Sequence, residues 1–447
     1  MDRTEELAKS PIGPLLLKFY IPAFVGVLAN TLYNIVDRIF IGQGVGAEAL
    51  SGVSAVFPIM LIVMGFGLLI GIGSGVLISI SLGRKNKESA EKILGTGFTL
   101  MLLVSAFITL VGFALKKPIL HAFGATGEIF GFANDYLNVI LLGTVFQVVG
   151  FSLNNIIRSE GNARIAMFSM LLSAGTNVIL NPVFIFGLGW GVQGSAWATN
   201  ISMLLLDVWV IAHFRSKRAV IRLKRTYIRV DFQILKEITA IGLSPFAMQI
   251  AGSLVQGILN SRLIRFGGDL AVGGMGIINS IISLVGMTIV AINMASQPVI
   301  GFNYGARSFV RVKEVLKTTV AGATIIAIVS SILIELFSAE IVSLFNTSSP
   351  RLAEITVPGL RIFAISLPVV GFQIVTGNYF QSVGKARIAI LLTLLRQIIV
   401  LLPLLLILPR WFGLNGIWIA NPVSDTVSAM IVFVFLVREW RRLNLSL

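Results

Sequence analysis

Apolar runs of twenty or more residues recur along the whole chain, separated by glycines, prolines or short charged clusters. A helix of about 20 apolar residues spans the hydrocarbon core of a bilayer. Only 12% of the 447 residues are charged, against about 25% in a soluble domain. The pattern therefore predicts an all-α polytopic membrane protein. We expect twelve transmembrane helices, over residues 14–41, 52–82, 93–115, 132–157, 164–187, 191–214, 236–262, 271–301, 315–338, 355–381, 386–409 and 412–437.

The two halves of the chain repeat one another at a nearly constant offset. Residues 161–166 and 384–389 share Gly-x-Ala-Arg-Ile-Ala at an offset of 223, and residues 191–194 and 413–416 share Gly-x-x-Gly at an offset of 222. Six helices in each repeat give both halves the same orientation. We therefore expect two six-helix lobes related by a pseudo-two-fold axis along the membrane normal, as in alternating-access carriers. The predicted domains are the lobes 1–214 and 237–447, joined by the basic linker 215–236.

Lysine and arginine are distributed unevenly between the two sides of this topology. The termini and the loops on their side hold 25 of the 35 basic residues, and the opposite loops hold six. Basic loops face the cytoplasm, so both termini are expected there, with the protein in the cell membrane. This rule also accounts for the net charge of +15 without nucleic acid as a partner. Anionic lipid is a possible partner of the linker, but a solvated topology signal is the favoured interpretation.

Several kinds of site are not predicted. The chain has no cysteine, and its two histidines, His121 and His213, lie far apart, so no zinc site is expected. Glycines spaced by four between Gly67 and Gly83 indicate close helix packing, and no Walker A motif occurs. A nucleophile–base pair is not apparent in the predicted helices, so we expect neither an enzyme nor a cofactor.

The first predicted helix carries a carboxylate near one end. Asn30, Asn34 and Asp37 follow one another at spacings of four and three, which places them on one helical face. An ionisable residue in a membrane helix is costly and indicates a functional site. The alternative is a carboxylate near the headgroups, with Arg38 as its neighbour.

Polar residues of two further helices lie at the predicted depth of Asp37. They are Asn177 and Asn181 on the fifth helix and Thr199 on the sixth. Counted at about 1.5 Å per residue, all four lie within roughly 6–15 Å of the outer surface. Hard cations such as sodium bind oxygen ligands of this kind. Alternatively, Asp37 binds a proton, because burial disfavours a charged carboxylate.

Other residues are candidates to line a substrate cavity. Methionine is flexible and polarizable, and suits variable apolar ligands, although core packing is an equally good interpretation. The second half carries a polar stripe on its first helix that includes Gln256 and Asn260. The charged residues within the predicted helices of the second half are Arg361, Arg396 and Asp425. Whether they pair with one another is left open. The predicted cavity residues are Asn30, Asn34, Met60, Asn154, Met170, Met203, Asp207 and Gln256.

Taken together, these motifs resemble the multidrug and toxic compound extrusion (MATE) family, in its DinF-like prokaryotic branch. The resemblance covers essentially the whole chain. The segments that carry it are Asp37–Gly42, Asn177-x-x-x-Asn181-Pro182, Gly191–Thr199 and Asn378–Arg387.

The resemblance implies an antiporter, coupled to protons or sodium, that exports small cationic or amphipathic compounds. It implies that Asp37 is the coupling carboxylate, with Asn177 and Thr199 beside it, and that Pro22 is a hinge. Members of this branch often have aspartate where this chain has Asn181, which puts a relay of two carboxylates in doubt. We expect a monomer. The alternative function is a lipid-linked oligosaccharide or lipid flippase of the same wider superfamily.

Overall fold

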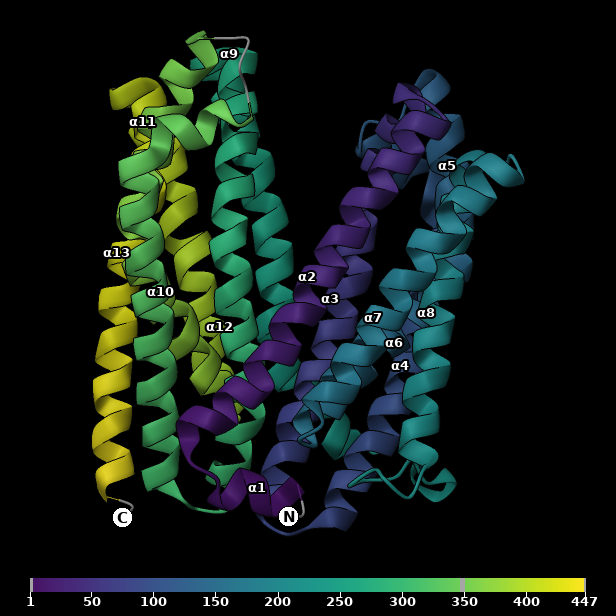
Figure 1. Ribbon diagram of the computed structural model, residues 1–447, viewed down its shortest axis with the longest axis vertical. Coiled ribbons are helices and arrows are strands. Elements are labelled where there is room, and N and C mark those ends of the chain that lie inside the picture. The colour runs from purple at the N-terminus through teal and green to yellow at the C-terminus, as the bar shows by residue number, and fades with distance from the viewer. Residues whose placement is uncertain (1–2, 346–349, 446–447) are drawn as a thin grey trace. The chain divides into compact units, whose positions relative to one another are not determined.

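The structure, a computed structural model, describes residues 3–345 and 350–445. Every regular element in these residues is a helix (Figure 1). The elements are α1 (Arg3–Lys9), α2 (Ile12–Gly44), α3 (Ala47–Gly83), α4 (Lys87–Ala122), α5 (Gly127–Leu142), α6 (Thr144–Ser159), α7 (Ala163–Pro182), η1 (Val183–Gly187), α8 (Gly191–Arg215), η2 (Arg225–Tyr227), α9 (Phe232–Gly305), α10 (Phe309–Ser343), α11 (Pro350–Ser382), α12 (Ala386–Leu394), η3 (Leu395–Leu401) and α13 (Leu402–Leu445).

Twelve membrane-crossing segments can be recognised among the described residues. Nine continuous helical stretches are long and apolar enough to cross a membrane, and the bent pair α5 and α6 supplies a tenth. Three of the nine contain an internal break: at Phe337, close to the end of α10, at Gly268 in α9 (φ 69°) and at Gly413 in α13 (φ 56°). Glycine adopts such left-handed angles without steric cost. The two glycine breaks each divide one stretch into two crossings, whereas the short end of α10 beyond Phe337 adds none, which confirms the predicted number of crossings.

One predicted helix differs from the structure. The sequence predicts an unbroken helix over residues 132–157, but α5 and α6 meet there at a bend of 56°. The amide of Asn200, on α8, donates to the carbonyl oxygen of Val139 over 2.6 Å. It fills the space beside Gly143, where a Cβ atom would lie 1.9 Å from it. The helix bends because a side chain from another helix takes part in its hydrogen bonding.

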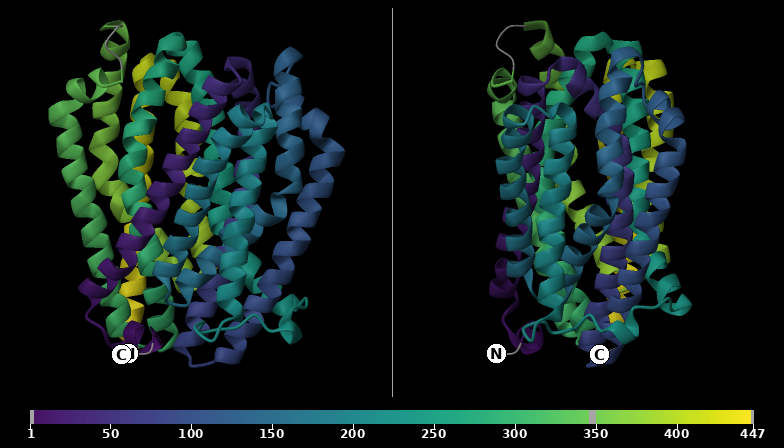
Figure 2. Two further views of the ribbon diagram at one scale, coloured as in Figure 1. Left: turned by 45° about the vertical axis from the view of Figure 1, so that its right-hand side comes forward. Right: turned by 90° about the vertical axis from the view of Figure 1, so that its right-hand side faces the viewer.

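Helix contacts divide the chain into two compact units. The first unit contains the residues up to Ser10 and Lys18–Phe246, and the second contains Pro11–Leu17 and the residues from Ala247 onward. Within each unit the helices run side by side along the unit's long direction (Figure 1, Figure 2). Both α2 and α9 contribute residues to each unit. The predicted domain boundaries at 214 and 237 were set from the sequence repeat and not from helix contacts, and they stay a prediction.

Small residues allow the helices of the first unit to pack closely. A Cβ atom at Gly71 of α3 would lie 2.7 Å from the Cα atom of Ser152 on α6. The Ser152 hydroxyl donates to the carbonyl oxygen of Gly67 over 2.9 Å. One turn beyond Gly75, the Ser79 hydroxyl donates to the carbonyl oxygen of Ser159, also over 2.9 Å. The glycine ridge is thus a packing surface, as small residues in membrane helices commonly are.

The basic segment predicted as a linker is attached to the first unit by two buried glutamates. The backbone N–H of Ile221 donates to Glu160 over 3.4 Å, and that of Arg222 donates to Glu91 over 3.2 Å. The Lys224 ammonium contacts Glu91 at 2.6 Å, and this hydrogen bond raises the pKa of Lys224. The side chains of Arg222 and Lys224 are exposed. The segment therefore holds a defined backbone path while its charges remain at the surface.

Candidate functional site

Asp37 is the buried centre of a hydrogen-bonded cluster in the first unit. It lies on α2, with 8% of its surface exposed. One carboxylate oxygen, Oδ1, accepts hydrogen bonds from the Asn181 amide at 2.7 Å and from the Ser195 hydroxyl at 2.6 Å. The Asn181 amide also donates to the Asn177 amide oxygen over 2.9 Å. Asn177 in turn donates to the Thr199 hydroxyl over 3.1 Å. The structure thus brings together the four residues predicted to bind the coupling ion.

Helical spacing in α7 and α8 aligns this cluster. Asn177 and Asn181 are four residues apart on α7, as Ser195 and Thr199 are on α8, so each pair lies on one helical face. The two helices lie side by side (Figure 1). Their short connection begins with the π-helix η1, directly after Asn181 and Pro182. Single-turn π segments occur frequently at functional sites.

The charge of Asp37 is not matched by a cation. No salt bridge to Asp37 occurs among the described residues, and both of its hydrogen-bond donors are neutral. Arg38, its neighbour in sequence, is exposed, and its guanidinium lies over the Phe57 ring of α3 at 4.9 Å. Arg38 therefore makes no ion pair with Asp37, and the alternative of a carboxylate near the headgroups stays open.

The cluster offers oxygen atoms of the kind that hard cations bind. Besides the carboxylate, it contains the hydroxyls of Ser195 and Thr199 and the amide oxygens of Asn177 and Asn181. The Asn181 Oδ1 atom is buried and accepts no hydrogen bond from the described residues. Oxygen ligands of this kind suit sodium, and the carboxylate alone is sufficient for a proton. No cluster of three or more metal-binding histidine or acidic side chains is present in the described part of the chain.

Ser195 is the residue of the cluster that the sequence analysis did not select. It is fully buried and makes the shortest contact to Asp37, at 2.6 Å. Its spacing of four from Thr199 was a usable signal, because both residues must share a face of α8. Ser195 lies one turn closer to the start of α8 than Thr199, the hydroxyl predicted from its depth.

The predicted cavity residues of the first unit occupy different environments. Asn154 of α6 is buried and donates to the Ala166 carbonyl oxygen of α7 over 2.9 Å. Asn34 is exposed and donates to the Asn30 carbonyl oxygen over 2.7 Å. The sulfur of Met60 accepts from the Tyr136 hydroxyl over 4.0 Å. The structure does not bring these residues into the Asp37 cluster.

The remaining candidates lie nearer the cluster or in the other unit. Met170 of α7 contacts α2, since a Cβ atom at Gly26 would lie 2.8 Å from its sulfur. Met203 and Asp207 are buried on α8, one and two turns beyond Thr199. Gln256 is exposed in the second unit. The substrate-binding roles of the whole predicted set stay predictions.

Asp425, a buried carboxylate of the second unit, has a cationic partner, unlike Asp37. The Arg396 guanidinium donates to Asp425 over 2.6 Å, and the Ser366 hydroxyl donates to the same carboxylate over 3.0 Å. Arg361 instead donates to the Ser338 hydroxyl over 2.7 Å. Of the alternative pairings left open by the sequence, the structure therefore contains the one between Arg396 and Asp425.

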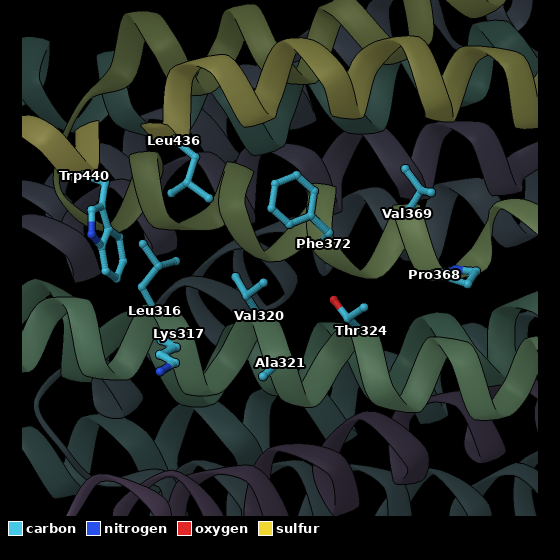
Figure 3. Close-up of a pocket in the computed structure, with 10 residues that line it drawn as sticks. All are labelled: Leu316, Lys317, Val320, Ala321, Thr324, Pro368, Val369, Phe372, Leu436 and Trp440. Atoms are coloured by element: carbon cyan, nitrogen blue, oxygen red, sulfur yellow. The ribbon is translucent and has the colours of Figure 1, made fainter. Parts of the chain in front are cut away.

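A groove of about 660 Å³ lies in the same unit, between α10, α11 and α13 (Figure 3). Its lining is apolar apart from Lys317 and Thr324. It contains none of the predicted site residues, so it is not the candidate site.

Comparison with known proteins agrees with the fold and the repeat. The family model described as MatE matches residues 22–183 and 246–407, one segment in each half. The multidrug export protein MepA of Staphylococcus saprophyticus is 28% identical over 433 residues, which cover 96% of this chain and 95% of MepA. A solved MATE structure in the bent conformation is 27% identical, with a TM-score of 0.93 and coverage of 99% of this chain and 98% of the other. One in the straight conformation is 26% identical, with a TM-score of 0.92 and 99% coverage of both chains. Because the matched segments make up well over half of the sequence, this chain belongs to the MatE family.

Proposed function

We propose that this chain is an ion-coupled antiporter that exports cationic, amphipathic compounds across the cell membrane by alternating access. One observation carries the proposal: Asp37 is a buried carboxylate contacted only by neutral donors among the described residues. The relative MepA is named a multidrug export protein, which supports the substrate class. Both termini lie in the cytoplasm in this proposal, following the distribution of basic residues.

Competition for one negative charge provides the coupling. When the ion binds Asp37, the carboxylate no longer attracts a cationic substrate, so the two ligands alternate. Coupling also requires that the ion bind one conformation more tightly, because equal affinity for both shifts no population. The two residues that contact Asp37 lie on α7 and α8, whereas Asp37 itself lies on α2. A movement of α2 relative to these helices therefore changes the affinity of the site.

Pro22 is the proposed hinge for such a movement. It lies inside α2, two turns before Asn30, and is buried. Proline has no N–H group, so α2 lacks the hydrogen bond to the carbonyl of Lys18 and bends there more easily than elsewhere. Solved relatives occur in conformations described as bent and straight, which supports two arrangements of the fold.

The coupling ion is a proton or sodium, and the cluster accommodates either. Substrates are small cationic or amphipathic molecules, with Met170 and Met203 as adaptable contacts near the charge. The transporter works as a monomer in this proposal, since each chain contains both repeats.

The test is transport in proteoliposomes with pH and sodium gradients imposed separately. The Asp37→Asn variant keeps the shape of the side chain and removes its charge. We expect it to lose gradient-driven export of a cationic dye, because charged hydrogen bonds contribute about 1.5–3 kcal/mol, or about 10–100-fold in affinity. Undiminished export by this variant would refute the proposal.

A matched control removes a carboxylate elsewhere. Asp269 is exposed on α9, and Asp269→Asn is expected to transport like the wild type. Failure of both variants would point to a general loss of folded protein, which thermal unfolding of each variant detects.

The flippase alternative is not favoured. A lipid-linked oligosaccharide carries phosphate, which calls for free cationic side chains. The two arginines within the predicted helices of the second half already have partners: Arg361 contacts Ser338 and Glu335, and Arg396 contacts Asp425.

A further inference from the structure

Buried polar side chains continue from the Asp37 cluster along the facing stripes of α7 and α8. On α8 the stripe consists of Ser195, Thr199, Met203 and Asp207, at a constant spacing of four and with at most 5% of each residue exposed. On α7 it consists of Asn181, Asn177, Ser173 and Ser169, equally spaced and equally buried. The stripes meet where Asn177 donates to Thr199 over 3.1 Å, and where the Ser173 hydroxyl lies 3.9 Å from the Met203 sulfur.

Asp207 ends the stripe on α8, and no ion pair to it occurs among the described residues. It is 4% exposed, and its Oδ1 atom accepts no hydrogen bond from the described residues. This atom points toward α6, because a Cβ atom at Gly150 would lie 2.9 Å from it. The next nearest atoms to that Cβ position are Leu206 Cδ2, at 3.2 Å, and the Met203 sulfur, at 3.8 Å.

The ionisable groups on the helices packed against Asp207 are engaged elsewhere or exposed. Arg158 of α6 donates to Asn154 over 2.5 Å, and His213 of α8 contacts Glu160. On α5, Tyr136 contacts Met60. The other groups are Arg164 and Glu128, which are exposed, Asp135, which is half-exposed, and Arg215, which is exposed. No ion pair joins Asp207 to any of these groups in the described part of the chain.

These surroundings suit a proton rather than a metal ion. An isolated ionised carboxylate in an apolar environment is so costly that it takes up a proton instead. Sodium requires several oxygen ligands, whereas Asp207 Oδ1 is buried and has no hydrogen-bond partner among the described residues. Asp207 lies twelve residues beyond Ser195 on α8, a distance of about 18 Å along the helix. Asp37 and Asp207 therefore lie at opposite ends of the buried stripes of α7 and α8.

We propose that Asp207 is a second proton-binding carboxylate of the first unit, which releases its proton when a cationic substrate binds. The proposal rests on the proposed antiport function and extends it. Asp207 supplies the second titrating carboxylate that Asn181 cannot supply. In chemical terms, the carboxylic acid gives its proton to water and the resulting carboxylate faces the incoming cation.

The test counts protons released when a cationic dye binds to the purified, full-length protein in weakly buffered detergent. We expect Asp207→Asn to release about one proton fewer per bound dye molecule than the wild type. Asp207→Glu should restore the wild-type proton count. The control is Ser202→Ala on the same helix, where the hydroxyl only bonds the Ala198 carbonyl oxygen at 2.6 Å. An unchanged count in Asp207→Asn would overturn the proposal.

A second measurement uses the wild type and does not depend on the folding of a variant. A hydrophobic carbodiimide modifies protonated carboxyl groups, and mass spectrometry locates the product. We expect Asp207 to be labelled, with labelling suppressed by bound dye, whereas the paired Asp425 stays unmodified. No labelling of Asp207 at any pH would overturn the proposal. Absence of gradient-driven export in the wild type would instead refute the antiport function.

Discussion

The two units place different chemistry at positions that the internal repeat relates. With the offset of 223, Arg396 corresponds to Ser173, and with the offset of 222, Asp425 corresponds to Met203. Both pairs are in contact, at 2.6 Å between Arg396 and Asp425 and at 3.9 Å between Ser173 and Met203. The same helix crossing therefore contains an ion pair in one unit and a hydroxyl–thioether contact in the other.

At the position of Asp37 the charged residue is in the first unit, and the corresponding residue of the second unit is uncharged. The offset of 223 relates Asp37 to Asn260, which is half-exposed and accepts from Gln256 of its own helix over 3.1 Å. In the first unit Asp37 thus has no cationic partner among the described residues, whereas Asp425 of the second unit is paired with Arg396. A paired carboxylate remains charged, whereas an unpaired one can exchange a proton or bind a cation. In the proposed mechanism, ion coupling therefore belongs to the first unit.

The largest expected effect comes from breaking the pair in the second unit. Arg396→Met leaves Asp425 buried with only Ser366 as a partner. Removal of one member of a fully buried pair costs about 3–5 kcal/mol, and we expect a smaller loss here because the Arg396 side chain is 29% exposed. Thermal unfolding in detergent measures it.

The double variant Arg396→Met, Asp425→Leu separates pairing from packing. Because both charges are removed together, it should recover most of the stability. If the double variant were as unstable as Arg396→Met, the charge of Asp425 would not be the cause. In the first unit, Asp37→Asn is expected to change stability less than Arg396→Met, since no cation is left unpaired.

The next largest effect is expected when a carboxylate is added to the Asp37 cluster of the first unit. Asn181→Asp would place a second carboxylate where the Asn181 amide now lies, 2.7 Å from Asp37 Oδ1. Two carboxylates so close cannot both ionise, and they share a proton. We expect the proton count on dye binding to rise by about one. An unchanged count would mean that Asp37 and its neighbour do not titrate during binding.

The sequence was sufficient to predict the number of crossings and four of the five residues of the Asp37 cluster, all except Ser195. Depth along a membrane helix follows from residue count, so Asp37, Asn177, Asn181 and Thr199 were placed at one level. Residue count does not give the rotation of a helix about its axis, which decides the neighbours that its side chains contact. For that reason the pairing of Arg396 with Asp425, which lie 29 residues apart, stayed open.

Contacts made by side chains from other helices were also beyond the sequence. The bend at Gly143 depends on the amide of Asn200, 61 residues from the carbonyl it contacts. Likewise, Asn154 was predicted as a cavity residue by its polarity, and the structure shows it bonding α7. Polar residues in membrane helices serve both purposes, and only the partner distinguishes them.

The smallest effect compares two serines that do the same thing in different units. The Ser195 hydroxyl donates to Asp37 over 2.6 Å, and the Ser366 hydroxyl donates to Asp425 over 3.0 Å. Each hydrogen bond to a charged group contributes about 1.5 kcal/mol at the lower end of the usual range. Ser195→Ala is expected to shift the half-saturating concentration of the coupling ion by about tenfold. Ser366→Ala should lower thermal stability slightly and leave that concentration unchanged, because Arg396 still holds Asp425. Equal shifts in both variants would mean that the second unit also binds the ion, and the assignment of coupling to the first unit would fail.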